Sequence, residues 1–338
     1  LDDFRTAQIS HLLTAAVTEF DIGDALSNGP RSFDDLRHEL QLPLRSAIVL
    51  LTALRSIELI DIDEEQRIVL TDYGHEKMSP TSPFHLRGYI GLGGFSADVQ
   101  NMISCLHNDK PSGDVSFVYH ENGPDSALDD AATADVLTRA MADRARNVAP
   151  ILAERLQLLD AKQLLDVGGG HGLYSYALLQ RHPDLRATIV DRAPALAVAQ
   201  EYADQLGLRS RVEFVMDDIH TMAIDGAIDT VLMANILHDY NDTDAAALVT
   251  RFADRLPPGG RLMILDAFLN SVAPEQPPVS DGPRAVAAYS ALLFSICEGR
   301  CYRLDEAERW LQEAGLRLES PVSDLPAHGT CLMGTKLA

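Results

Sequence analysis

The sequence predicts an α/β protein in two parts, a mainly helical N-terminal part and a C-terminal part with a mostly parallel sheet. Two observations support this prediction. Up to about residue 160, apolar residues recur at helical spacing around one short hairpin pattern, and beyond it strands and helices alternate with short turns. Such alternation builds a parallel sheet that helices cover on both faces. The length of 338 residues also fits two domains.

The N-terminal part has the predicted element order of a winged helix. Residues 11–20, 33–40 and 43–54 have helical spacing, and residues 59–62 and 67–70 alternate as two short strands around an acidic turn. Ser32 precedes an acidic first turn and is therefore expected to cap the second helix. Three helices followed by a hairpin are typical of a winged-helix-like domain.

A winged helix often binds DNA, but the composition of this chain argues against it. The helix that would enter the groove, residues 43–57, offers only Arg45 and Arg55 as cations. Affinity for phosphates needs several basic contacts, and the net charge here is −22. We therefore expect no nucleic acid partner. We also expect no membrane partner, because no apolar run approaches the ~20 residues of a membrane span.

Four cysteines stand at positions 105, 297, 301 and 331. They lack the Cys-x-x-Cys or Cys/His spacing of a zinc site, so no metal is expected. Free thiols are typical of a reducing compartment, which predicts a cytoplasmic protein.

The C-terminal part predicts strands that alternate with helices. A long helix over residues 133–159, interrupted or kinked at Pro150, leads into it. The predicted strands cover residues 163–167, 187–190, 212–215, 229–233 and 261–265, and the predicted helices cover 173–181, 193–206, 243–256 and 285–296. Ligands of parallel sheets bind at the carboxyl ends of the strands.

A glycine-rich turn follows the first of these strands. Residues 166–172 read Asp-Val-Gly-Gly-Gly-His-Gly, which lets the backbone bend sharply and approach a ligand closely. The next helix offers free N–H groups and its positive dipole end to an anionic group. Asp191, at the end of the next strand, can accept hydrogen bonds from both hydroxyls of a ribose. The dinucleotide fingerprint fails, because Leu173 or His171 stands where it needs glycine.

A histidine block follows the fourth strand. Residues 234–242 place His238 just past the carboxyl end of a strand, on the ligand side of the sheet. Histidine is the only side chain whose unperturbed pKa suits proton transfer near neutrality. His238 is therefore either a catalytic base or a structural histidine.

Three blocks together resemble a known family. They are residues 165–172, residues 237–242 (Leu-His-Asp-Tyr-Asn-Asp) and residues 256–261 (Leu-Pro-Pro-Gly-Gly-Arg). With their spacing they resemble the O-methyltransferases of the plant caffeate and hydroxyindole type and their bacterial natural-product relatives, which depend on S-adenosylmethionine (SAM). The resemblance extends over nearly the whole chain.

This resemblance implies an organisation for the chain. Residues 1–105 would form a winged-helix-like dimerisation domain, and residues 106–159 a helical linker that contributes to the substrate pocket. Residues 160–338 would form a Rossmann-like methyltransferase domain with a mostly parallel seven-stranded sheet. The family also implies a homodimer. It further implies a small aromatic or polyketide-like acceptor of secondary metabolism, methylated on a hydroxyl with release of S-adenosylhomocysteine (SAH).

The resemblance also implies roles for single residues. His238 matches the base that removes a proton from the substrate hydroxyl, and Asp266 matches an acidic residue that orients it. The positions that match the SAM site are Asp166, Gly168, Gly170, Asp191, Arg192, Asp217, Asp218 and Ile219. The positions that match the substrate pocket are Met141, Tyr240, Leu293 and Cys297. Apart from Tyr240, these pocket residues fit a core or an interface equally well.

Three positions depart from the family pattern. Tyr302 stands where the plant enzymes have a second acidic residue, Tyr240 replaces a tryptophan, and Ala234 replaces a lysine. Two other interpretations therefore stay open. One is a SAM-binding relative that performs a hydroxylation, decarboxylation or pericyclic reaction. The other is a winged-helix regulator that senses a small molecule.

Overall fold

The computed structural model describes residues 7–112, 130–158, 160–224 and 226–337. Contacts within the chain divide it into two compact units. The first unit is Leu1–Pro124 with Leu269–Asp305, and the second is Asp125–Phe268 with Glu306–Ala338. The family resemblance implied one domain over residues 160–338, whereas the structure groups Leu269–Asp305 with the N-terminal unit.

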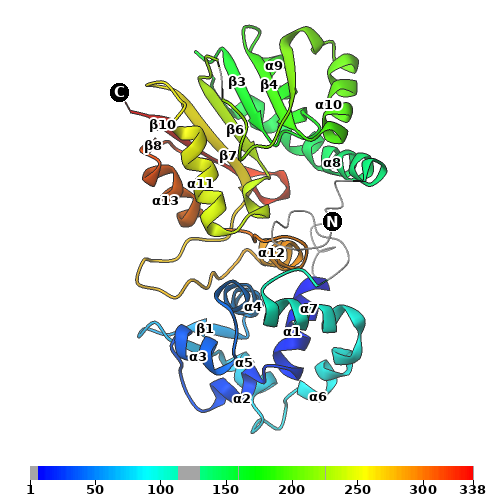
Figure 1. Cartoon of the computed structure of the whole chain (residues 1–338). Helices are drawn as coiled ribbons and strands as arrows, with labels where there is room; N and C mark the ends of the chain where they lie inside the picture. Colours follow the sequence, from blue (N-terminus) through cyan, green and yellow to red (C-terminus); the bar gives the residue numbers. More distant parts are fainter. Residues whose placement is uncertain (1–6, 113–129, 159, 225, 338) are drawn as a thin grey trace. The chain divides into compact units, whose positions relative to one another are not determined.

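The first unit contains the predicted three helices and hairpin, the helix predicted over residues 285–296, and further helices that the sequence pattern did not predict. Ser32 caps α3 as expected, because its Oγ accepts a hydrogen bond from the Asp35 N–H at 3.1 Å. The strands β1 and β2 pair antiparallel. The elements, shown in Figure 1, are α1 (Ala7–Thr18), α2 (Ile22–Ser27), α3 (Phe33–Glu39), α4 (Leu44–Ser56), β1 (Ile60–Ile62), β2 (Ile68–Leu70), α5 (Asp72–Met78), α6 (Arg87–Ile90), the 3-10 helix η2 (Gly91–Phe95), α7 (Ala97–Asn108) and α12 (Arg284–Ile296).

Helix α12 belongs to the first unit because it packs against α4, α1 and α7. Arg45 of α4 donates to Asp109 Oδ1 at 2.7 Å and to the carbonyl oxygens of residues 297 and 299 at 2.9 Å each. Arg55 donates to the Val279 carbonyl oxygen at 2.7 Å. Helix α4, the helix that would enter the groove of DNA, is mostly buried, and both of its arginines bind groups of their own unit.

The second unit is built on one eight-stranded sheet with the order β5-β4-β3-β6-β7-β10-β8, and β9 pairs with β10. The first five strands of this order are parallel, and β10 runs antiparallel to β7. The prediction of a mostly parallel sheet is confirmed, but the sheet has eight strands where seven were expected. The strands are β3 (Gln163–Val167), β4 (Arg186–Asp191), β5 (Val212–Met216), β6 (Thr230–Ala234), β7 (Arg261–Ala267), β8 (Leu316–Leu318), β9 (Val322–Leu325) and β10 (Gly329–Lys336).

Helices cover both faces of this sheet. In Figure 1, α8, α9 and α10 lie on one side, and α11 and α13 on the other. Helix α8 continues through Pro150, where an interruption or kink was predicted, and it packs against α9 and α10. That packing can offset the hydrogen bond that proline removes. The helices are α8 (Ala131–Arg155), α9 (Leu173–Arg181), α10 (Ala193–Gln205), α11 (Asp242–Ala253) and α13 (Leu304–Glu313).

The parallel pairing of β4, β3, β6 and β7 brings four carboxyl ends to one edge of the sheet. The glycine turn follows β3, Asp191 ends β4, the histidine block follows β6, and Asp266 lies near the end of β7. Chain topology alone therefore brings the glycine turn, Asp191, His238 and Asp266 to one edge.

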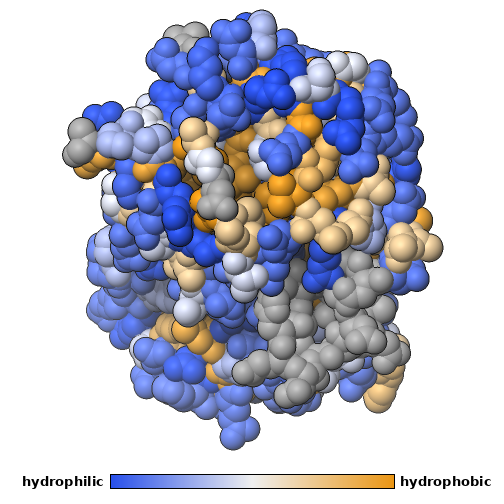
Figure 2. All heavy atoms as spheres, turned by 45° about the horizontal axis from the view of Figure 1, so that its top comes forward, coloured by the Kyte–Doolittle hydropathy of each residue, from blue (hydrophilic) through white to orange (hydrophobic). Residues whose placement is uncertain are grey.

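The surface combines a hydrophilic exterior with local apolar patches, as Figure 2 shows for one face. In the first unit, five large apolar side chains between positions 84 and 95 are exposed. We call them the apolar strip: Phe84 (65% exposed), Leu86 (43%), Tyr89 (76%), Leu92 (73%) and Phe95 (95%). Among the helices of the described residues, none has the length and apolar character needed to cross a membrane.

Candidate active site

The glycine turn adopts a backbone shape that other residues disfavour. Gly168, Gly170 and Gly172 have φ angles of 64°, 52° and 74°, all in the left-handed region. A Cβ on Gly168 would lie 2.8 Å from the Ile236 side chain, and one on Gly172 would lie 2.5 Å from the Tyr176 ring. The turn therefore depends on these glycines, and it places bare backbone at the carboxyl edge of the sheet.

Asp191 is held by the backbone of this turn. Its Oδ2 accepts a hydrogen bond from the Gly170 N–H at 2.7 Å, and its Oδ1 accepts one from the Arg192 N–H at 2.7 Å. Burial raises the pKa of Asp191, and the two N–H groups oppose that shift. Each carboxylate oxygen has a further lone pair, so Asp191 can still accept hydrogen bonds from ligand hydroxyls.

Asp166 lies beneath the turn and is almost fully buried, with 1% of its surface exposed. Its Oδ2 accepts a hydrogen bond from Ser175 Oγ at 2.6 Å, whereas its Oδ1 has no hydrogen-bond partner among the described residues. Burial raises the pKa of Asp166 to about 7, because the hydrogen bond from Ser175 offsets only part of the loss of hydration and Asp191 adds a like charge. This carboxyl group therefore titrates near neutral pH.

His171 is a neutral part of the turn. It is buried, and its Nδ1 accepts a hydrogen bond from the Leu173 N–H at 3.1 Å. Burial, helped by the positive charge of Arg146, lowers the pKa of His171 to about 4. The ring thus satisfies one of the free N–H groups at the start of α9, a role that the sequence analysis did not predict.

His238 and Asp266 form a buried pair. The distance from His238 Nδ1 to Asp266 Oδ1 is 2.7 Å, and both residues are 4% exposed. The same Asp266 oxygen accepts a hydrogen bond from the Ala267 N–H at 2.8 Å, which fixes the carboxylate. Because Nδ1 donates to the carboxylate, the neutral ring carries its lone pair on Nε2. That atom lies 3.7 Å from Asp239 Oδ1.

Opposing effects set the basicity of His238. Burial lowers its pKa, but the negative charges of Asp266 and Asp239 outweigh burial, and the hydrogen bond to Asp266 adds to them. The positive charge of Arg144 acts in the other direction. The net result is a raised pKa, which makes this histidine a stronger base than a solvated imidazole.

The remaining predicted residues of the second unit lie after β5 and β6. Asp217 and Asp218 are exposed and accept hydrogen bonds from neighbouring N–H groups, and Ile219 is buried. The Tyr240 ring is buried and meets the His220 ring edge-on, with 4.9 Å between the centroids.

The other predicted pocket residues are divided between the units. Met141, on α8 in the second unit, is half exposed. Leu293 and Cys297 are buried in the first unit, where Cys297 Sγ donates to the Leu293 carbonyl oxygen at 3.0 Å. Their role in a substrate pocket stays a prediction.

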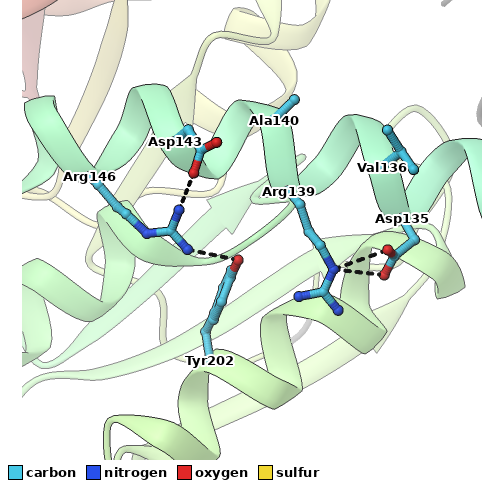
Figure 3. Close-up of a pocket in the computed structure, with 7 residues that line it drawn as sticks. All are labelled: Asp135, Val136, Arg139, Ala140, Asp143, Arg146 and Tyr202. Carbon is cyan, nitrogen blue, oxygen red and sulfur yellow. Dashed lines mark hydrogen bonds and ion pairs between the residues drawn. The ribbon is translucent and has the colours of Figure 1, made fainter.

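A surface pocket of about 440 Å³ lies between α8 and α10 (Figure 3). Arg139 binds the Asp135 carboxylate at 3.0 Å and that of Glu201 at 2.6 Å, and Arg146 donates to Tyr202 Oη at 2.9 Å. The cations that line this pocket already have protein partners, so we do not assign it a ligand. Over the described part of the chain, no group of three His, Cys, Asp or Glu side chains could hold a metal ion.

Two further residues at the carboxyl edge were missed by the sequence analysis. Asn235 follows β6, and its amide Nδ2 donates to Tyr174 Oη at 3.2 Å. A polar residue directly after a parallel strand is a usable signal for Asn235. Tyr174 offered none, because its pattern is that of an ordinary apolar helix position.

The parallel sheet, the glycine turn and the buried His–Asp pair are typical of α/β enzymes, whose ligands bind at the carboxyl edge of the sheet. Comparison with known proteins identifies the family. The model of the O-methyltransferase domain family matches residues 119–317. The chain therefore belongs to the O-methyltransferase family, which confirms the predicted resemblance and the predicted enzyme class.

Individual relatives agree with this family. A 3-hydroxy-5-methyl-1-naphthoate 3-O-methyltransferase from Streptomyces sahachiroi is 26% identical over 90% of this chain and 84% of its own. The crystal structure of an O-methyltransferase family 2 protein from Planctomyces limnophilus in complex with apigenin is 34% identical. It covers 99% of this chain and 95% of its own, with a TM-score of 0.87.

A third protein shares the fold. It is an O-methyltransferase from neocarzinostatin biosynthesis, solved with SAM and 2-hydroxy-5-methyl naphthoic acid. It is 19% identical with a TM-score of 0.59, and it covers 98% of this chain and 96% of its own.

The raised pKa of Asp166 predicts a pH-dependent stability. Its pKa in the folded state, about 7, exceeds the ordinary aspartate value of 3.8, so the folded state binds the proton more tightly and stability falls as the pH rises between these values. Asp166→Asn should remove this component. The free energy of unfolding of the variant minus that of wild type should therefore rise by roughly 2–3 kcal/mol from pH 5 to pH 8. Urea denaturation of both proteins at the two pH values measures this difference.

The exposed Asp160, in the same unit, supplies the control variant Asp160→Asn, which should follow the wild-type pH dependence. An Asp166→Asn curve parallel to the wild-type curve would show that Asp166 is already ionised at pH 5.

Proposed function

We propose that this chain transfers a methyl group from SAM to a hydroxyl group of a small aromatic acceptor, with His238 as the general base. The observation that carries the proposal is the buried 2.7 Å contact between His238 Nδ1 and Asp266 Oδ1. The pair lies at the same sheet edge as the glycine turn, so a base and a cofactor cradle share one site.

The residues of the turn fit SAM. The bare backbone at Gly168 and Gly170 suits close approach by the amino-acid end, and Asp191 offers carboxylate oxygens to a ribose. Asp218 and Ile219 would flank the adenine, with Asp166, Arg192 and Asp217 at the border of the site. SAM in the structure of the neocarzinostatin enzyme supports this assignment. When bound, SAM supplies a methyl group on a positively charged sulfur.

His238 would accept the proton of the acceptor hydroxyl on Nε2. A phenol has a pKa near 10, so removal of its proton produces a better nucleophile at neutral pH. Asp266 would hold the ring orientation and stabilise the imidazolium that forms, as the acidic residue does in hydrolase triads. General-base catalysis contributes about 10²–10⁴-fold, and alignment of the reacting groups can contribute several kcal/mol more.

An aromatic acceptor is supported by the relatives. The Streptomyces enzyme is named for a hydroxynaphthoate, and the Planctomyces protein was solved with apigenin. The His–Asp pair favours methyl transfer over the repurposed chemistries, because hydroxylation or decarboxylation does not require a base for a substrate hydroxyl. Membership of an enzyme family, together with the internally paired Arg45 and Arg55, argues against a DNA-binding regulator.

We also propose that the chain forms a homodimer through its first unit. The apolar strip supports this, because five large apolar side chains in one short segment are unusual on the surface of a monomer. A stable interface buries roughly 1,200–2,000 Å² in total, and a second copy of the strip would supply a matching apolar surface.

Removal of the base should separate catalysis from binding. His238→Ala should lower kcat by about 10²–10⁴-fold while the affinity for SAH stays within a few-fold of wild type, measured by SAH formation and by calorimetry. The exposed His75 gives the control variant His75→Ala, which should keep wild-type turnover. Unchanged turnover in His238→Ala would refute the assigned base.

A charge placed in the apolar strip should disrupt the proposed dimer. Phe95→Asp should shift the mass measured by light scattering from dimer to monomer, because Phe95 is 95% exposed and contributes little to the core of its own unit. Leu337→Asp changes an exposed apolar residue in the other unit and should leave the dimer intact. A wild-type protein that is monomeric at micromolar concentration would contradict this part of the proposal.

A further inference from the structure

Asn235 has an unusual backbone conformation at the carboxyl edge of the sheet. Its φ is 54°, in the left-handed region that few residues other than glycine adopt. Its N–H donates to the Leu265 carbonyl oxygen at 2.8 Å, which attaches it to β7 one residue before Asp266. The neighbouring strand therefore holds Asn235 in place, three positions before His238.

The amide group of Asn235 is only half satisfied. Its Nδ2 donates to Tyr174 Oη, whereas its Oδ1 is buried and has no hydrogen-bond partner among the described residues. A buried acceptor without a donor destabilises the protein, so a ligand that supplies a donor would recover that loss. The residue as a whole is only partly buried, and the terminal torsion of asparagine is soft, so a small rotation can turn Oδ1 toward a ligand.

The neighbours of this amide lie beside the glycine turn. The next residue, Ile236, is the side chain that a Cβ on Gly168 would meet at 2.8 Å. Tyr174 is 5% exposed and lies in the first turn of α9, the helix that follows the glycine turn. Burial raises the pKa of the Tyr174 hydroxyl, so this hydroxyl stays protonated.

We propose that Asn235 Oδ1 accepts a hydrogen bond from the α-ammonium group of SAM, and that Tyr174 positions the amide for it. This inference rests on the proposed cofactor, whose amino-acid end we place at Gly168. An ammonium group can only donate hydrogen bonds, so it is a suitable partner for Asn235 Oδ1, an acceptor without a donor among the described residues. A neutral amide accepts this hydrogen bond without adding another negative charge beside His238 and Asp266.

A hydroxyl group of the methyl acceptor is the other donor that could reach this amide. The two sources differ in a measurable way. SAH carries the α-ammonium group, whereas 5′-methylthioadenosine has the same nucleoside and thioether but lacks the amino-acid end. A variant that affects only the ammonium contact must weaken the binding of SAH and leave the binding of 5′-methylthioadenosine unchanged.

Calorimetric titration of the full chain with both ligands tests the proposal. Asn235→Gly removes the amide while it tolerates the left-handed backbone. It should weaken the affinity for SAH by roughly 10- to 100-fold, the range for a hydrogen bond to a charged group. The affinity for methylthioadenosine should change less than two-fold. Asn235→Asp keeps an acceptor and adds a negative charge, so it should bind SAH at least as tightly as wild type. Tyr174→Phe should produce a smaller loss, again for SAH alone.

Three results would contradict the assignment. An equal loss for both ligands in Asn235→Gly would assign Asn235 a purely structural role. Unchanged SAH affinity with a raised KM for a phenolic acceptor would identify the acceptor as the hydrogen-bond donor. Weaker SAH binding in Asn235→Asp would exclude an ammonium partner. By contrast, failure of the wild-type chain to bind SAH at all would contradict the proposed function itself.

Discussion

The hydrogen bond between His238 and Asp266 joins the ends of two adjacent parallel strands, and the candidate site depends on it. Asp266 lies near the end of β7, and His238 follows β6, which pairs with β7 in parallel register. The same sheet places β3 beside β6, so the glycine turn and the base meet at one edge. A slip of one residue in the pairing of β6 and β7 would turn Asp266 to the other face and remove the pair.

Two carboxyl groups and one neutral histidine lie around the glycine turn, at the carboxyl edge of the sheet, and they favour a positively charged ligand. Asp166 and Asp191 lie under and beside the glycine turn, and burial raises the pKa of both. His171, in the same turn, is held neutral by burial rather than contributing a positive charge. Buried carboxylates without a counterion are costly for the protein alone. A sulfonium and an ammonium group supplied by a ligand would offset that cost, which agrees with the proposed cofactor.

The sequence predicted what is encoded locally. The glycine turn, Asp191 at the end of its strand, and the Ser32 cap all follow from short motifs with a direct physical reason. The approximate positions of β3, β4, β6 and β7 followed from hydrophobic pattern, and their shared edge from the rule for parallel sheets. The partnership of His238 with Asp266 came from family resemblance, since nothing local links residues so far apart in the chain.

The features that the sequence did not predict depend on contacts between segments that are distant in the chain. The return of Leu269–Asp305 to the first unit arises from the packing of α12 on α4 and α1, which no local pattern records. The pairing of β9 with β10 added an eighth strand for the same reason. The hydrogen bond of the Asn235 N–H to β7 and the contact of its amide with Tyr174 join segments that are distant in the chain, so these partners could not be assigned before β6 and β7 were placed side by side.

The most direct test of the central claim is the protonation of the His238 ring itself. Nitrogen NMR of the labelled chain, with the signal assigned by comparison with His238→Gln, reports both the tautomer and the pKa. We expect a proton on Nδ1 in the neutral form and a pKa above the ordinary value of about 6.5, and this pKa should fall in Asp266→Asn. A neutral ring protonated on Nε2, or a pKa at or below the ordinary value, would contradict the assignment of His238 as a base held by Asp266.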